Sequence, residues 1–137
     1  GNLYPVSQIS ALCQKHDALF HSDTVQAMGH LPINVKDVHY DFLTCSAHKI
    51  HGPKGIGFVY VKSGLKVKPF IQGGGQERNL RAGTENTIGI CALGKAFEIA
   101  TSEMAVDQKK VEALKLRVIQ EVQRVVPGVK FFGRSAE

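Results

Sequence analysis

The stretch Ser46-Ala47-His48-Lys49-Ile50-His51-Gly52-Pro53-Lys54-Gly55-Ile56-Gly57 decides how the fold is interpreted. The run from Asp41 to Cys45 before it predicts a buried strand, and Ile56 to Val61, rich in β-branched and aromatic residues, predicts another. Glycines and prolines separate these two predicted strands. A hydroxyl, an imidazole and an amine therefore follow the end of the first strand directly, at Ser46, His48 and Lys49.

The residues before this stretch predict one further helix and strand. Apolar residues from Val6 to Cys13 recur at helical spacing, with Ser7 as the expected cap and an end near Lys15. Ala18 to His21 then predicts a buried strand that delivers Asp23 at its carboxyl end. A helix followed by strands indicates an α/β fold.

The residues after Gly73-Gly74-Gly75 predict two long helices and a last strand. The first helix is expected from about Thr87 to Ala105, and an apolar stripe from Val111 to Val125 predicts the second. The run Val129 to Phe132 is expected to form a strand. We place a domain boundary near 105–107, between the two predicted helices.

Composition bounds the class of protein. The chain has 137 residues, 43% of them hydrophobic, and a formal net charge of +5 whose basic residues are scattered among acidic ones. Such scatter argues against nucleic-acid binding, and no apolar run approaches the length of a membrane span. Cys13, Cys45 and Cys91 are odd in number and form no C-x-x-C pair, so a disulfide framework is not indicated and a reducing cytoplasm is the expected location.

The polar residues after the first two predicted strands suggest one cofactor. Ligands of open α/β sheets lie at the carboxyl ends of the strands, where His21 to Gln26 and Ser46 to Lys49 would meet. Pyridoxal phosphate requires an amine, an acid beside its pyridine nitrogen, and donors to its phosphate and phenolic oxygens. Each residue alone also has a simpler interpretation, because a lysine after a strand is usually solvated and an aspartate there usually caps a turn.

Three motifs in order resemble those of the cysteine desulfurases. They are the stretch 46–57, Asp23-Thr24-Val25-Gln26 upstream, and the glycine-rich string from Gly73 to Asn86. The resemblance implies the fold type I pyridoxal-phosphate fold of the class V aminotransferase branch, an α/β fold with a mixed, mostly parallel sheet and flanking helices. It also implies that 1–106 is the C-terminal part of a cofactor-binding large domain and that 107–137 begins a small C-terminal domain.

The resemblance assigns roles to six residues. Lys49 would carry the cofactor covalently and shuttle the α-proton of the substrate. Asp23 would pair with the protonated pyridine nitrogen, and Gln26 would donate a hydrogen bond to the phenolic oxygen. The phosphate ligands would be Ser46, His48 and, reaching across a homodimer to the partner's cofactor, Thr84.

The reaction implied by the resemblance converts L-cysteine to L-alanine and leaves the sulfur as a persulfide on an enzyme cysteine. A sulfur-acceptor or scaffold protein would then receive it, for iron–sulfur cluster assembly or transfer-RNA thiolation. The family's persulfide cysteine and carboxylate-binding arginine are expected beyond Glu137, and its ring-stacking histidine before Gly1, so this chain alone is expected to be inactive. The three cysteines present are interpreted as buried small residues.

Alternatives remain open at this point. A selenocysteine lyase shares these motifs, and a non-catalytic dimerisation or partner-binding module would keep the fold without the chemistry. His21 is interpreted as a packed histidine more readily than as a cofactor contact. The histidines show no paired metal-ligand spacing, and the triple glycine is not followed by G-K-[ST], so we expect neither a metal nor a nucleotide.

Overall fold

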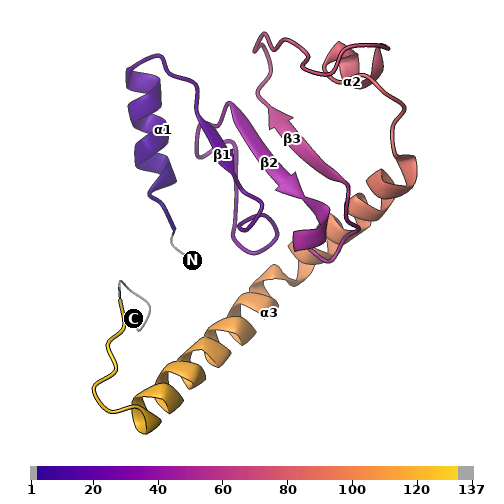
Figure 1. Ribbon diagram of the computed structural model, residues 1–137. Helices are drawn as coiled ribbons and strands as arrows, with labels where there is room; N and C mark the ends of the chain where they lie inside the picture. Colours follow the sequence, from indigo (N-terminus) through magenta and orange to yellow (C-terminus); the bar gives the residue numbers. More distant parts are fainter. Residues whose placement is uncertain (1–2, 133–137) are drawn as a thin grey trace. The chain divides into compact units, whose positions relative to one another are not determined.

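A three-stranded mixed sheet organises the N-terminal part of the chain. The computed structural model describes residues 3–132, and its contacts divide the chain into two units, Gly1–Thr101 and Ser102–Glu137, each described by itself. In the first unit, β1 (His21–Asp23), β2 (Phe42–Ser46) and β3 (Gly57–Val61) lie side by side in that order (Figure 1). β1 runs parallel to β2, and β3 runs antiparallel to it. The expected mixed α/β sheet is confirmed, and the second and third strands lie within one residue of their predicted bounds.

The first strand is shorter than predicted and begins later. Ala18 and Leu19 precede β1, and the Leu19 side chain is 64% exposed, so only Phe20 of the expected buried run enters the core. The backbone of Phe20 also contacts the segment at the start of β2, since its carbonyl accepts hydrogen bonds from the amides of Asp41 and Phe42. The strand predicted from Ala18 to His21 is therefore wrong except at His21, where β1 begins.

The first helix, α1 (Val6–Lys15), forms as predicted but is not capped by Ser7. Pro5 occupies the cap position, no side chain makes a capping hydrogen bond, and Ser7 lies inside the first turn. Proline's fixed φ suits the start of a helix. Val6 and Cys13 of this helix pack against a buried cluster of Phe20, Tyr40 and Leu43.

One face of the sheet carries most of the packing. The side chains of β2 alternate, with Leu43 and Cys45 buried and the residues between them half-buried. A second buried cluster joins Ala47, Ile50 and Leu93, the last of these from the helix α3. Phe58 of β3 extends this cluster and meets Phe97 of α3 edge to face, with ring centroids 6.0 Å apart.

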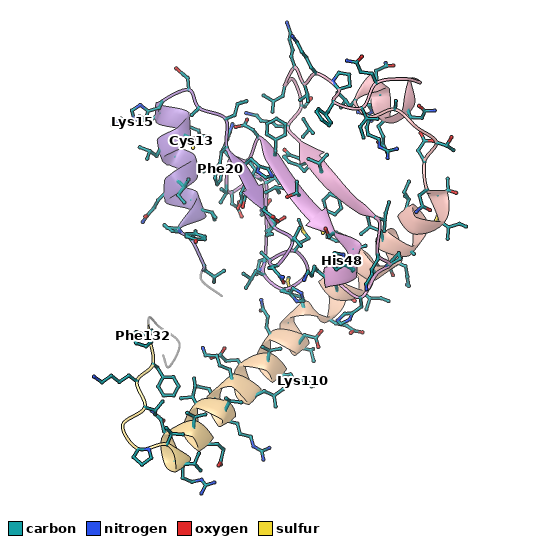
Figure 2. All side chains as sticks on the ribbon, viewed as in Figure 1. Cys13, Lys15, Phe20, His48, Lys110 and Phe132 are labelled. Atoms are coloured by element: carbon teal, nitrogen blue, oxygen red, sulfur yellow. The ribbon has the colours of Figure 1, made fainter. Side chains whose placement is uncertain are left out.

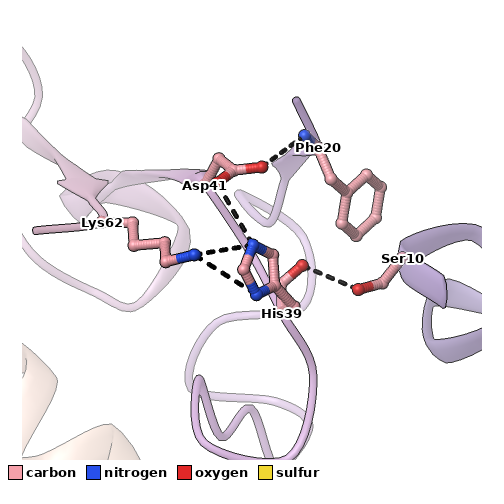
Figure 3. Close-up of polar contacts among 5 residues, drawn as sticks. All are labelled: Ser10, Phe20, His39, Asp41 and Lys62. Carbon is pink, nitrogen blue, oxygen red and sulfur yellow. Dashed lines mark hydrogen bonds and ion pairs between the residues drawn. The ribbon is translucent and has the colours of Figure 1, made fainter. Parts of the chain in front are cut away.

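A buried carboxylate links β1 to the segment before β2 (Figure 3). Asp41 is 4% exposed; its Oδ2 accepts a hydrogen bond from the Phe20 amide at 2.8 Å, and its Oδ1 lies 3.3 Å from His39 Nε2. Lys62 Nζ lies 2.9 Å from the same ring nitrogen, and Ser10 Oγ of α1 donates to the His39 carbonyl at 2.7 Å. Helix α1, the loop that carries His39 and the residues that flank the three strands therefore meet at one polar cluster, at the end of the sheet where β1 and β2 begin.

Two predictions for the C-terminal residues are wrong. A single helix, α3 (Thr87–Val125), replaces the two expected helices, and neither glycine nor proline occurs between 105 and 111 to interrupt it. The helix ends before Pro127-Gly128 as expected, but 129–132 form no strand. A strand requires a hydrogen-bonded neighbour, and the ladders of residues 3–132 join only β1, β2 and β3. Of the helices described, none has the length and apolarity needed to cross a membrane.

The domain prediction, 1–106 and 107–137, stays a prediction. The two compact units meet between Thr101 and Ser102, inside α3 rather than at a linker.

Candidate functional site

The carboxyl ends of β1 and β2 bring the two predicted polar clusters to one edge of the sheet. The parallel register pairs Asp23 with Thr44, two residues before Ser46. Because side chains alternate along a strand, Asp23, Thr44 and Ser46 lie on the same face, opposite the buried Leu43 and Cys45. Figure 2 shows Phe20 and His48 toward opposite ends of the sheet, and His48 lies at this carboxyl edge.

The Asp23 carboxylate is held by a turn that begins where β1 ends. Its Oδ1 accepts a hydrogen bond from the Val25 amide at 2.9 Å, while the side chain remains exposed. The next residue, Thr24, is buried and ties the turn to β2: its amide and Oγ1 both donate to the Thr44 carbonyl, at 3.1 and 2.7 Å. The carboxylate is thus exposed but fixed in direction, and Gln26 lies exposed in the same turn.

Lys49 closes a short 3-10 helix, η1 (Ala47–Lys49), that follows β2 directly. Ala47 is fully buried and Ile50 is 1% exposed, so both ends of this turn are anchored in the core. The Lys49 carbonyl lies 3.1 Å from His30 Nε2, and the lysine side chain is half-buried. Among residues 3–132 no hydrogen bond or ion pair engages the Lys49 amine, so the amine is available to a ligand at this edge.

Two glycines of the motif allow the backbones to approach closely. Gly57 pairs with Ser46, and a side chain at Gly57 would collide with the Cys45 carbonyl oxygen. A Cβ at Gly52 would lie 2.9 Å from the Ala47 Cβ. The glycine spacing of the 46–57 stretch therefore serves the packing beneath η1, which holds the turn that carries Lys49.

Thr84 is not brought to this edge by the contacts described. It is exposed and lies between the short helix α2 (Gln76–Asn79) and α3. Within residues 3–132 no recorded hydrogen bond joins Thr84 to Asp23, Ser46 or Lys49. Five of the six predicted cofactor residues thus share one edge of the sheet, and the sixth stands apart.

The donor set at this edge fits pyridoxal phosphate. An unengaged amine, an oriented carboxylate and a hydroxyl with an exposed imidazole are the groups that this cofactor requires. Lys49, Asp23, and Ser46 with His48 supply them in that order. The groups approach one edge from two different strands, which a single surface lysine or a capping aspartate would not explain.

Other chemistry finds less support in the described residues. No group of three or more histidine, cysteine, aspartate or glutamate side chains is placed to hold a metal ion in residues 3–132. A cavity of about 330 Å³ lies between α1 and residues 35–39, which include His39 of the cluster at the amino-terminal end of the sheet. None of the six predicted site residues lines it.

The cysteines differ more than predicted. Cys45 is buried, and burial raises the pKa of its thiol, which a backbone hydrogen bond with Ser46 opposes only partly. Cys13 is half-buried, and Cys91 is exposed, so the expectation that all three are buried is wrong for Cys91. Helical spacing predicted that Cys91 lies on the apolar face of the helix. It did not predict that no other element of the described residues covers α3 at this position.

Sequence reasoning also missed contacts of two residues, one beside Lys49 and one beside Thr84. His30 contacts the Lys49 carbonyl, and Gln76 accepts a hydrogen bond from the Gly83 amide next to Thr84. Neither contact has a signal in the sequence, because each joins a side chain to a backbone group brought near by a turn.

The sequence of this chain is similar to those of known proteins. A model of the aminotransferase class-V family matches residues 1–137. A cysteine desulfurase IscS of Clostridium botulinum is 47% identical over 97% of this chain and 34% of the relative, and that of Methanosarcina thermophila is 42% identical over 91% and 31%. The chain spans about a third of the length of the curated relatives it matches.

Solved structures agree in fold. A NifS-like protein from Rickettsia africae superposes with a TM-score of 0.77 at 35% identity, over 85% of this chain and 33% of that one. A structure described as SspA in complex with cysteine gives a TM-score of 0.69 at 43% identity, over 72% of this chain and 29% of that chain.

Proposed function

The chain belongs to the class-V aminotransferase family, and we propose that the full-length protein carrying it is a pyridoxal-phosphate-dependent cysteine desulfurase. The family implies the cofactor, and relatives at 42 to 47% identity bear the desulfurase name. The single observation that carries the proposal is the meeting of Lys49, Asp23 and Ser46 at one sheet edge, with the lysine amine unengaged in residues 3–132. The substrate would be L-cysteine, and a similar solved structure is described as a cysteine complex.

Three residues would act on the reacting part of the cofactor. When bound, pyridoxal phosphate supplies an electron sink for the bond that breaks at the substrate's α-carbon. Lys49 would hold the cofactor and move the α-proton, since its amine stands on a turn anchored by Ala47 and Ile50. Asp23 would keep the pyridine nitrogen protonated, because a fixed carboxylate favours the charged form of a neighbouring base. Gln26 would donate to the phenolic oxygen.

The phosphate would be bound by residues of two loops. Ser46 and His48 flank the start of η1, where a hydroxyl and an imidazole can donate to phosphate oxygens. Thr84 stands apart from them in this chain, which is compatible with its serving the cofactor of a second copy. We therefore include a homodimer in the proposal.

The sulfur would pass to an acceptor or scaffold protein, for iron–sulfur cluster assembly or transfer-RNA thiolation, in the cytoplasm. The three cysteines are odd in number and lie far apart in the sequence, which is consistent with a reducing compartment. The buried Cys45, with its raised thiol pKa, is a poor candidate for holding the transferred sulfur.

The test compares the full-length protein with its Lys49→Ala variant after addition of pyridoxal phosphate. The wild type should show a yellow absorbance band, borohydride should abolish it, and peptide mapping should then find the cofactor on Lys49. Lys66→Ala, an exposed lysine outside the motif, is the matched control and should keep the band. Production of alanine from L-cysteine should fall by at least about a thousandfold in Lys49→Ala.

Two results would redirect the proposal. A wild-type protein without a Lys49-dependent band would favour a non-catalytic dimerisation or partner-binding module of the same fold. A protein that binds the cofactor but turns over L-selenocysteine while sparing L-cysteine would be a selenocysteine lyase.

A further inference from the structure

The glycine-rich segment between β3 and α3 is closed by two hydrogen bonds. The Ala82 amide donates to the Ile71 carbonyl at 3.2 Å, and the Gly83 amide donates to Oε1 of Gln76 at 3.0 Å. Ala82 is 7% exposed, although most of the segment around it is exposed. Residues 71–83 therefore form a loop that two contacts close. One is the backbone hydrogen bond between Ala82 and Ile71, and the other is the hydrogen bond from the Gly83 amide to the Gln76 side chain.

The hydrogen bond from Gly83 to Gln76 stabilises a loop whose backbone has several residues with positive φ. Glu77, Arg78 and Asn79 follow Gln76 with φ of 47°, 56° and 64°, three successive non-glycine residues in the left-handed region. Each costs about 1–2 kcal/mol relative to the right-handed conformation. Gly83 has φ +106°, a conformation that glycine alone adopts readily. The Gly83 amide consequently points to the Gln76 side chain instead of continuing a regular backbone pattern.

We infer that Gln76 is a positioning residue for Thr84, which it orients for the phosphate of the cofactor in a second copy of the chain by fixing the Gly83 amide one residue away. This inference rests on the proposed function, because it concerns the phosphate site of that cofactor. The Gln76 amide oxygen acts on the backbone and does not itself contact the phosphate. Loss of this amide oxygen would release the Gly83 amide beside Thr84. The affinity for the phosphate group should then fall, while binding of the pyridine ring should not change.

The experiment measures the affinity of the full-length protein for pyridoxal phosphate and for pyridoxal, which lacks the phosphate. Gln76→Met keeps the length of the side chain but removes the acceptor. It should weaken pyridoxal phosphate binding about five- to tenfold, the effect of one hydrogen bond, and change pyridoxal binding less than twofold. Gln72→Met is the matched control: Gln72 lies exposed in the same loop, no recorded hydrogen bond within residues 3–132 involves it, and both affinities should stay unchanged.

A double-mutant cycle with Thr84→Val separates positioning from general destabilisation. If Gln76 acts through Thr84, the double variant should bind pyridoxal phosphate no more weakly than Thr84→Val alone. Equal weakening of both ligands by Gln76→Met, unchanged affinity for both, or additive losses in the double variant would each overturn the inference. A wild type that binds neither ligand would instead overturn the proposed function, and the inference with it.

Discussion

Replacing Asp41 with alanine should loosen the start of β1. The carboxylate accepts a hydrogen bond from the Phe20 amide and lies beside His39, and it is almost fully buried (Figure 3). Alanine leaves that amide without its partner in a place that water cannot easily reach. Since Phe20 directly precedes β1, the change should be felt first by the strand that carries Asp23.

The magnitude follows from the type of bond. A hydrogen bond to a charged acceptor contributes about 1.5–3 kcal/mol, and every 1.4 kcal/mol is a factor of ten in an opening equilibrium. Amide hydrogen exchange at Phe20 in the full-length protein should therefore accelerate about 10- to 100-fold in Asp41→Ala. Single-residue mass spectrometry of exchanged protein measures this directly.

Two variants make the result decisive. Asp41→Asn keeps an oxygen acceptor for the Phe20 amide and should accelerate exchange less than tenfold. Asp37→Ala removes an exposed carboxylate that accepts a hydrogen bond from the Asn34 side chain in a surface loop, and it should leave exchange at Phe20 unchanged. Equal exchange rates in Asp41→Ala and the wild type would refute the role given to this carboxylate.

Three further predictions concern packing, thiols and pH. Gly29→Ala should lower the unfolding free energy by about 2–4 kcal/mol in denaturant titrations, because Gly29 has φ +76° and a Cβ there would lie 2.8 Å from Ile50 Cγ2; a loss below 0.5 kcal/mol would contradict this. Alkylation under native conditions followed by peptide mapping should modify Cys91 well before Cys45, whose thiol is buried with a raised pKa, and the reverse order would be inconsistent with the packing. Burial also raises the pKa of Tyr40 above 10.0, so its contribution is fully present below that value and is lost as the pH rises through the folded-state pKa; chemical unfolding above pH 10.0 should show a decline that Tyr40→Phe reduces.

The site edge could be predicted because its signals are local. Strand β3 is a short run of β-branched and aromatic residues, a glycine-rich turn separates it from β2, and both strands formed where expected. The α/β pattern predicted that the polar residues after β1 and β2 meet at one edge of the sheet, whereas the register that pairs Asp23 with Thr44 is known only from the structure. The resemblance of the 46–57 stretch to the lysine motif of the cysteine desulfurases is what singled out Lys49.

Features that depend on packing or hydrogen-bond partners elsewhere in the chain could not be predicted. The apolar run before β1 contributes only Phe20 to the core, since the side chain of the neighbouring Leu19 is 64% exposed. The strand expected from Val129 to Phe132 needs a neighbour that the sequence pattern does not specify. The bond from Gly83 to Gln76 depends on a left-handed turn at Glu77 to Asn79, and propensity alone would not place three such residues together.

Because β1 and β2 pair in parallel, the positions of the site residues do not depend on the length of the loop that connects the two strands. Asp23 and Ser46 are held by the ladder and by the buried Thr24, while Asn34 to Asp37 lie exposed in the connection. Closing a longer flexible loop adds only about 0.6 kcal/mol for each doubling of its length. A peptide tag or a fluorescent reporter inserted at Asn34–Asp37 would thus leave the two strand ends in register, which makes this loop the natural place to attach a label to the protein.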